Sequence, residues 1–364
     1  MAESISPPSI AADHPSILFV VHQMGTLDHT ISLYKQVTRA GATAHLALGD
    51  PSLVLPDWFT EELAALVVID DPLQAIAESR YDSIVMQMPY DDLKDPVWAT
   101  FGREEAFIIY SAYGLGVQLI KWDHGVYELP FFARCSLILA SSPHSLNRYL
   151  NSGFSPRAAF WSGDPLMHEL THTELASSET PSILWAPHWS EKWVDGEPGF
   201  STWKSTVHDV LAVARRNPSA QFIVRGHPLM KVGGDDFRSR QATKSYNALL
   251  QLPNARLSTV SMKEDIIEST ALLTDGISII AYYAATGKPM AVVRKAMIWP
   301  PFNTAGKALV NQSDIVHDSK SIRAWLRAAC SFQLDSSAER QELVDQLFPL
   351  HRESPGQLLF NELI

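Results

Sequence analysis

Four short peptides join apolar runs to side chains suited to acid–base or phosphate chemistry. They are Trp122–Gly125 (WDHG), Ala186–Trp189 (APHW), Arg225–Pro228 (RGHP) and Thr274–Ser278 (TDGIS). The first three each contain a histidine, and an imidazole with a pKa of about 6.5 can give or take a proton at neutral pH. The fourth places a hydroxyl at the start of an expected helix. Together such groups could activate an attacking hydroxyl and stabilise the charge on a departing phosphate.

The two strongest histidines receive different roles. We expect His124 to be the general base, because an imidazole can take the proton of an alcohol as it attacks, and Asp123 or Glu128 could orient the ring. We expect His227, with Arg225 beside it, to meet a diphosphate and stabilise the developing charge. The alternatives are a structural hydrogen bond for His124 and a structural ion pair for Arg225.

The remaining histidines are weaker candidates. His188 is placed at the same site, but it could simply stack on Trp189. His22 and His29 flank the loop after the first expected strand, where Gly25 fits the turn; they could line an acceptor pocket, but we favour exposed loop residues. Three histidines could suggest zinc, yet His124, His188 and His227 lie in no HxH or HExxH pattern, and the two cysteines form no CxxC. We therefore expect no metal and no cofactor.

The fourth peptide lies in a stretch, Ala271–Val293, that is typical of strand, turn, helix, turn and strand. Asp275 is expected to be the helix N-cap, and Gly276 permits the sharp turn. The helix is expected over 277–286. Its free N–H groups and positive dipole end would face the carboxyl edge of a parallel sheet, which suits a phosphate or diphosphate, and Ser278 adds a donor. The alternative is an ordinary βαβ unit without a ligand.

The rest of the chain shows the same alternation of apolar runs and amphipathic segments, twice over. The first set begins with the buried strand Ile17–Val21, and the second begins with Ile183–Ala186. This pattern predicts an α/β fold with two Rossmann-like domains facing each other across a cleft, with ligands at the carboxyl ends of the strands. The opening unit lacks a GxGxxG fingerprint, so a dinucleotide is not expected there.

Composition sets the expected domain limits. Residues 1–16 are small and polar and are interpreted as a disordered leader, not a signal peptide. Residues 17–172 are expected to form an N-terminal acceptor domain and residues 181–345 a C-terminal nucleotide-donor domain. Residues 346–364 are expected to form a helix that could return to the first domain.

The overall composition narrows the class of protein and its location. The chain has 364 residues, of which 46% are hydrophobic and 19% charged, as in a soluble globular protein. Its net charge of −11 disfavours broad binding to nucleic acid or anionic lipid. Two distant cysteines, Cys135 and Cys330, favour a reducing compartment. We therefore expect a cytoplasmic protein without a nucleic-acid partner, and leave open peripheral contact with the inner face of a membrane.

At these residues the chain resembles the CDP-glycerol:poly(glycerophosphate) glycerophosphotransferases of teichoic acid and capsule synthesis, over roughly residues 117–310. The family's WHG(T)P motif is similar to Trp122–Gly125, with one inserted residue. Further matches are GF with Gly153-Phe154, GxPR(x)D with Gly163-Asp164-Pro165, ILYAPTWR with Ile183–Ser190, R-x-HP with Arg225–Pro228, ITDYSSI with Leu273–Ile279, and NKPI with Gly287–Met290.

The resemblance implies a GT-B fold in which His124 is the base and the second domain holds the diphosphate of a nucleotide-activated donor. The expected catalytic residues are His124 and His227. The residues expected on the donor side are Arg225, Asp275, Gly276, Ser278, His188, Pro187, Trp189 and Gly163. Those expected on the acceptor side are His22, Gly25, His29 and Asp123.

Several positions depart from the family pattern. Ser190 replaces an arginine, Gly276 and Ile277 replace a tyrosine and a serine, and residues 126–128 replace prolines and a lysine. The function expected from the resemblance is transfer of glycerophosphate from CDP-glycerol to a hydroxyl of a glycan or lipid-linked acceptor, with release of CMP. The alternatives are a glycosyltransferase using a CMP- or UDP-activated sugar and a non-catalytic nucleotide-binding protein. A hydrolysing nucleotide-sugar epimerase ranks lower.

Overall fold

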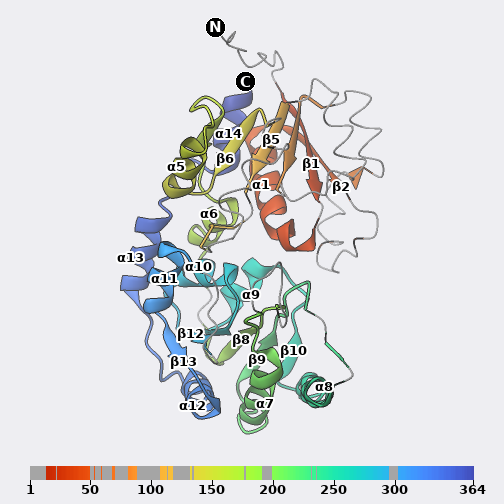
Figure 1. Ribbon diagram of the computed structural model, residues 1–364, viewed down its shortest axis with the longest axis vertical. Helices are drawn as coiled ribbons and strands as arrows, with labels where there is room; N and C mark the ends of the chain where they lie inside the picture. Colours follow the sequence, from red (N-terminus) through yellow and green to blue (C-terminus); the bar gives the residue numbers. More distant parts are fainter. Residues whose placement is uncertain are drawn as a thin grey trace. The chain divides into compact units, whose positions relative to one another are not determined.

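A computed structural model gives the fold, and its described residues form two compact units (Figure 1). The described residues are 14–21, 23–49, 53, 59, 68–69, 81–87, 107–112, 114–117, 132, 135–175, 178–190, 199–230, 232–234, 236–294 and 302–364. Unit 1 draws on Met1–Gly116, Ile120–Glu169 and Phe348–Ile364, and unit 2 on Val117–Leu119 and Leu170–Leu347.

Unit 1 is built on a parallel sheet with the strand order β3-β2-β1-β4-β5-β6-β7. In register, Phe19 of β1 lies beside Leu46 of β2 and Val85 of β4. The central strands are buried along most of their length, which explains their unbroken apolar runs. The strands are β1 (Ser16–Val21), β2 (Thr43–Leu48), β3 (Val68–Ile69), β4 (Ser83–Met86), β5 (Phe107–Ser111), β6 (Leu137–Ala140) and β7 (Ala159–Trp161).

The helices of unit 1 include two from opposite ends of the chain that pack side by side. They are η1 (Met24–Thr26), α1 (Leu27–Ala40), α5 (Pro143–Asn151), α6 (Pro165–Thr171) and α14 (Pro355–Leu363). Gly356 of α14 lies so close to α1 that a Cβ atom there would come within 2.3 Å of Gln36 Cβ. The Gln36 amide accepts from Gly356 N at 3.2 Å and donates to Pro165 O at 2.9 Å. One buried side chain therefore joins α1, α6 and α14.

Unit 2 is built on a second parallel sheet with the strand order β10-β9-β8-β11-β12-β13. Its strands are β8 (Ser182–Ala186), β9 (Gln221–Val224), β10 (Ala255–Leu257), β11 (Ala271–Thr274), β12 (Met290–Val293) and β13 (Asp314–Val316). Helices α7 (Trp203–Ala214), α8 (Phe237–Leu250) and α12 (Ser319–Ala329) share one core with the sheet. The connections through α9 (Met262–Glu268), α10 (Ser278–Ala284) and α11 (Thr304–Asn311) run the other way along the sheet and cover its opposite face. Helix α13 (Ala338–Leu347) packs on α10 and α11.

The predicted fold class, α/β with two Rossmann-like units, is confirmed. Some elements differ from the prediction. Gly153-Phe154 and Trp161–Pro165 are expected from the sequence to be turns, and Gly153 and Gly163 do have positive φ, of 94° and 83°. Between these two glycines, however, β7 completes the first sheet, and α6 already begins at Pro165. Helix α11 and strand β13 were not predicted, because a three-residue strand is too short to show a pattern. In the part of the chain that the structure describes, no helix is long and apolar enough to cross a membrane.

Candidate functional site

Three of the four predicted peptides lie at one edge of the second sheet. They follow β9, β8 and β11, which are neighbouring parallel strands, so their carboxyl ends lie at the same edge. The backbone joins them directly: His227 N donates to Pro187 O at 3.2 Å, and Arg225 N donates to Trp185 O at 2.9 Å. The remaining peptide, Trp122–Gly125 with Asp123 and His124, lies outside the described residues, as does His22.

Two imidazoles and two larger aromatic rings form a cluster at this edge. The ring centroids of His188 and His227 are 5.2 Å apart. His188 stacks on Phe200 at 4.5 Å and lies 5.7 Å from Trp189, which is 6.0 Å from His227. The predicted stacking of His188 with Trp189 is thus a tilted contact, and the closer ring is that of Phe200. All four side chains are half-buried.

The backbone fixes the tautomer of both imidazoles. Ser190 N donates to His188 Nδ1 at 3.2 Å, and Leu229 N donates to His227 Nδ1 at 3.1 Å. Because a backbone N–H can only donate, each Nδ1 must be an acceptor, and the proton of each neutral ring lies on Nε2. Ser190 Oγ, 2.8 Å from His188 Nδ1, strengthens this assignment. The site therefore holds two Nε2–H donors.

Both rings stay neutral at neutral pH. Burial lowers the pKa of His188 to about 3, helped by repulsion from the neighbouring His227. Burial also lowers the pKa of His227 to about 4. Neither group titrates near pH 7, so neither is tuned for proton transfer there. Any charge stabilisation by His227 would come from its N–H dipole and not from a cationic ring.

The prediction that Asp275 caps the following helix is wrong. The N-cap of α10 is Ile277, without a side-chain hydrogen bond, and the Asp275 carboxylate reaches instead to the neighbouring loop. Its Oδ1 accepts from His188 N at 2.6 Å, and its Oδ2 accepts from Thr202 Oγ1 at 2.7 Å and from Thr202 N. Burial raises the pKa of Asp275, and the hydrogen bonds from Thr202 and His188 oppose that rise. Asp275 thus holds the His188 loop against the start of α7.

Among the residues of the turn after β11 that were predicted to bind the nucleotide donor, Ser278 is exposed. Gly276 is buried, and its N–H donates to Thr274 Oγ1 at 2.8 Å. The Thr274 hydroxyl donates in turn to Ala186 O at 2.6 Å, which ties the turn to β8. Pro187 is also buried, whereas Ser278, the first residue of α10, is exposed. At this turn Ser278 is therefore the side chain available to a ligand.

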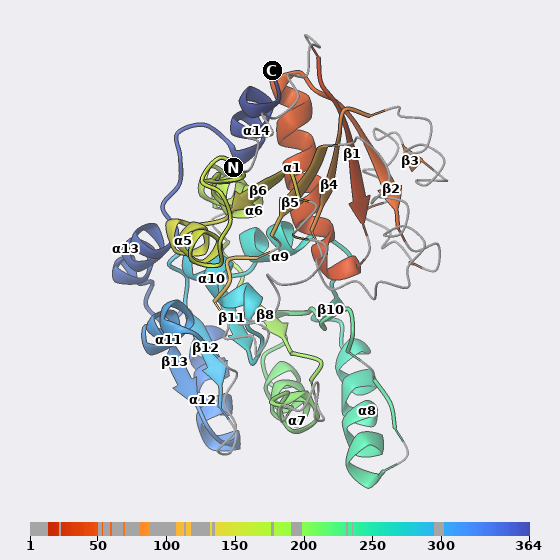
Figure 2. The ribbon, with the colours of Figure 1, turned by 45° about the horizontal axis from the view of Figure 1, so that its top comes forward.

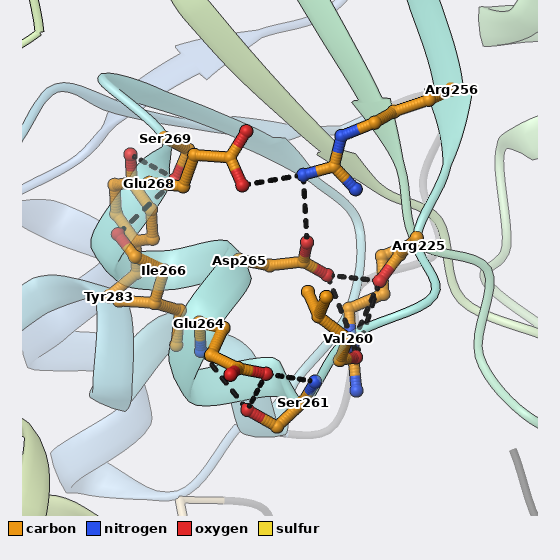
Figure 3. Close-up of polar contacts among 11 residues, drawn as sticks. Arg225, Arg256, Val260, Ser261, Glu264, Asp265, Ile266, Glu268, Ser269 and Tyr283 are labelled. Carbon is orange, nitrogen blue, oxygen red and sulfur yellow. Dashed lines mark hydrogen bonds and ion pairs between the residues drawn. The ribbon is translucent and has the colours of Figure 1, made fainter. Parts of the chain in front are cut away.

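Arg225 makes the ion pair that the sequence left as the alternative (Figure 3). Its Nη1 lies 2.9 Å from Asp265 Oδ2, 2.8 Å from Val260 O and 3.0 Å from Ser258 Oγ. Asp265 on α9 has 0% side-chain exposure and the Arg225 side chain 22%. Burial raises the pKa of Asp265, and the charge of Arg225 opposes that rise. This geometry makes Arg225 a brace between β9 and α9.

Helix α9 is itself held at both ends. At its start, Ser261 and Glu264 form a capping box. At its end, Lys288 Nζ donates to the carbonyl oxygens of Ile266 at 2.9 Å and Ser269 at 2.6 Å. Burial lowers the pKa of Lys288 to about 8. The sequence analysis missed Lys288 and Asp265 as site supports; the only available signal was the GKP match for the lysine.

A second arginine also approaches Asp265. Arg256 Nη2 lies 2.6 Å from Glu268 Oε2 and 3.8 Å from Asp265 Oδ1, as Figure 3 shows. The Arg256 side chain is more exposed than that of Arg225. The longer distance and greater exposure make Arg256 the weaker partner of the buried carboxylate.

The predicted site residues of unit 1 that the structure describes are His29, Gly25 and Gly163. His29 was expected in a loop, but it is a buried residue of α1, with Nδ1 3.4 Å from Asp164 Oδ2. The exposed-loop interpretation is wrong because η1 and α1 begin sooner after β1 than expected. Asp164 also accepts from Met167 N at 2.8 Å at the start of α6. Gly25 lies exposed in η1, and Gly163 precedes α6 with a φ of 83°. Their acceptor and donor roles stay predictions.

Metal binding was tested against the same geometry. Within the described ranges, no three His, Cys, Asp or Glu side chains are grouped so that they could hold a metal ion.

The comparisons with known proteins identify the architecture. No family model matches the chain. None of the curated proteins matches its sequence. Solved structures match it along nearly its whole length.

A putative UDP-N-acetylglucosamine 2-epimerase from Listeria monocytogenes has a TM-score of 0.62 at 9% identity, with 97% of this chain and 96% of that one covered. The UDP-GlcNAc 2-epimerase from Neisseria meningitidis, bound to UDP-GlcNAc, has a TM-score of 0.57 at 11% identity, covering 96% and 99%. A glycosyltransferase from Rickettsia africae has a TM-score of 0.50 at 12% identity, covering 97% of each chain. At these identities the likeness shows a shared fold, the two-unit α/β architecture of GT-B-like proteins.

Proposed function

We propose that this chain is an enzyme that acts on a nucleotide-activated sugar, with UDP or CMP as the nucleotide. The observation that carries the proposal is the pair His188 and His227, two neutral Nε2–H donors on neighbouring strand-end loops. The exposed hydroxyl of Ser278 follows the adjacent strand. Two of the similar structures are described as UDP-GlcNAc 2-epimerases and one as a glycosyltransferase, which supports a sugar nucleotide as the ligand class.

The proposed chemistry is cleavage of the bond between the sugar's anomeric carbon and the phosphate oxygen. As this bond breaks, negative charge grows on the departing nucleotide, and fixed N–H donors stabilise that charge without giving up a proton. His188 and His227 suit this task because each ring is held by a backbone hydrogen bond at Nδ1. In a transfer reaction, a hydroxyl of the acceptor attacks the same carbon and its proton passes to a base. By resemblance, that base is His124.

Asp275 and Arg225 act through other residues in this proposal. Asp275 fixes the backbone of His188, and the ion pair of Arg225 with Asp265 fixes the turn that carries His227. Both are positioning residues, since their polar atoms are used within the chain. This assignment replaces the direct phosphate contact that the resemblance implies for Arg225.

Transfer of glycerophosphate from CDP-glycerol is the second candidate. The match of Arg225–Pro228 to the R-x-HP motif favours it. In that reaction the hydroxyl attacks the glycerol-bearing phosphate, CMP leaves, and the phosphate stays in the product. Epimerisation without an acceptor, the activity in the names of two similar structures, is the third candidate. The fate of the phosphate and the need for an acceptor separate the three.

The test begins with binding of UDP, CMP, CDP, UDP-GlcNAc and CDP-glycerol, measured by calorimetry. Each sugar nucleotide is then incubated with saccharide and lipid-linked acceptors, and the products are analysed by mass spectrometry and phosphorus NMR. Release of UDP or CMP together with a phosphate-free glycosylated or epimerised sugar supports the proposal. A product that retains phosphorus supports glycerophosphate transfer. No binding to any of these nucleotides would remove all three candidates.

Two variants of His227 isolate its donor role. His227→Gln keeps an N–H group near the position of Nε2, whereas His227→Phe keeps the ring and loses the donor. The rate with His227→Phe should fall about 100-fold, as for loss of one donor to a developing charge, and the glutamine variant should recover much of it. His208→Phe is the matched control, because His208 is an exposed histidine of α7 in the same unit. Equal loss in both His227 variants would refute the donor role.

A further inference from the structure

Positive charge is concentrated in one part of this acidic chain. Residues 203–250 contain eight Lys or Arg and three Asp or Glu, although the whole chain has a net charge of −11. Two helices, α7 and α8, account for most of this segment. Such an asymmetry indicates that this segment binds a partner that the rest of the chain does not bind.

The cations lie on three helices in one row. Helix α7 packs against α8 on one side and α12 on the other, and Figures 1 and 2 show the order α12, α7, α8 from both directions. We call the outer surface of these helices the basic face. Its exposed or half-buried cations are Lys204, Arg215, Arg216, Arg238, Arg240, Lys244, Lys320 and Arg327.

The acidic groups of these helices are engaged within the fold. Helix α8 contains no Asp or Glu. Asp209 of α7 is buried and lies 2.7 Å from Arg323 Nε of α12. Asp236 and Asp318 are exposed N-caps that accept from the backbone of Ser239 and Ser321; they keep their negative charge and offset part of that of Lys204 and Lys320. On these helices and their caps, the basic face therefore keeps most of its positive potential.

Large apolar side chains border the basic face at the start of α8. Phe237, the first residue of that helix, is 68% exposed. In the preceding loop, Leu229 is 54% exposed and Val232 is 39% exposed. Phe237 directly precedes the exposed Arg238 on α8, and an exposed aromatic ring beside cations is a combination found on surfaces that lie in a lipid interface.

We propose that the basic face docks on the surface of an anionic lipid bilayer. The cations would attract anionic headgroups within a Debye length of about 8 Å, and Phe237 with Leu229 would enter the boundary of the acyl region. The acidic remainder of the chain is repelled by the same surface, so docking occurs in one orientation. Aliphatic side chains such as Leu229 and Val232 offer little to the phosphates and bases of a nucleic acid, which favours lipid as the occupant.

The test is co-sedimentation of the full chain with vesicles of phosphatidylcholine alone or mixed with phosphatidylglycerol, over a range of salt. We expect binding only to the anionic vesicles, and we expect it to weaken as salt rises. The triple variant Arg216→Gln/Arg238→Gln/Lys244→Gln should bind about 100-fold more weakly, at about five-fold per cation lost. Phe237→Ser should lower affinity without changing the salt dependence.

A matched control changes the net charge equally at another place. The variant Arg39→Gln/Arg157→Gln/Arg352→Gln removes three exposed cations of unit 1 and should bind like the parent. Equal loss in both triple variants would overturn the proposal, because net charge and not the basic face would then control binding. Failure to bind anionic vesicles would overturn it too, as would displacement from them by a duplex oligonucleotide that binds more tightly.

Discussion

The contribution of the brace between Arg225 and Asp265 to stability can be measured by replacing each residue separately and then both together. Asp265→Asn keeps the shape of the side chain but removes its charge, and it leaves the Arg225 cation with Ser258 Oγ and Val260 O as partners. Arg225→Met keeps the aliphatic stem but leaves the carboxylate of Asp265 buried. The double variant removes both charges, so neither charge is left buried without its partner.

The burial of this ion pair determines how much each variant should lower the free energy of unfolding. Breaking a buried pair from one side costs about 3–5 kcal/mol. Since the Arg225 side chain keeps 22% exposure, we expect Asp265→Asn to lower the free energy of unfolding by about 3 kcal/mol, the low end of that range. Arg225→Met should cost about 2 kcal/mol, because burial already raises the pKa of Asp265 and the carboxyl can take up a proton. The double variant should lose about 3 kcal/mol, a coupling of about 2 kcal/mol.

Hydrogen exchange measured by mass spectrometry suits this protein, because two compact units need not unfold in one step. Peptides that cover β9 and β11 report the opening of unit 2. Peptides that cover β1 and α1 report unit 1 and serve as an internal reference that should not change.

Additive losses, with the double variant about 5 kcal/mol less stable, would refute the coupling and hence the brace. Arg256→Met is the comparison at the same carboxylate. Its distance of 3.8 Å and greater exposure predict a loss below about 1 kcal/mol. A loss at Arg256 as large as at Arg225 would show that the assignment of partners is wrong.

Three further predictions concern other positions. Phe332 has a φ of 52° at the end of α12, so Phe332→Gly should relieve about 1 kcal/mol of strain and raise the thermal midpoint of unfolding by about 2–4 °C; an unchanged or lower midpoint would contradict this. A Cβ atom on Gly306 would lie 2.2 Å from Val117 O, so Gly306→Ala should lose more than about 2 kcal/mol in urea unfolding; a loss below 1 kcal/mol would show that the backbone yields easily. Because His188 and His227 have pKa values of about 3 and 4 in the folded chain and about 6.5 when unfolded, protons favour unfolding, and stability should fall by about 1.4 kcal/mol per ring for each pH unit from 6 to 4. Denaturant titrations across this range should show the slope, and the double histidine-to-glutamine variant should show a much smaller one.

The sequence correctly predicted the three strand-end peptides of unit 2 because their signals are local. An apolar run followed by Pro187-His188 or Gly226-His227 shows both the strand and its end. Parallel strands then bring such ends to one edge of a sheet. The architecture of alternating elements could be read in the same way, because each element needs only its own pattern.

The partners of the polar side chains could not be predicted, because they depend on strand order. Asp275 binds the loop after β8 because β8 lies beside β11, a neighbourhood that no local pattern encodes. Asp265 lies forty positions from Arg225 in the sequence and meets it only after α9 is placed. His29 was assigned to a loop, but α1 already begins at Leu27, after an N-cap Thr26 that makes no side-chain hydrogen bond.

The pairing of α14 with α1 has a consequence for synthesis on the ribosome. All of unit 2 precedes Phe348 in the sequence, so it is translated before α14 of unit 1. Unit 1 begins earlier in the sequence but takes α14 from residues that follow unit 2, and until these are made the side of α1 around Gln36 and Val37 has no cover from Gly356. Although its first strands are made before unit 2, unit 1 can therefore complete its packing only after all of unit 2 has been translated.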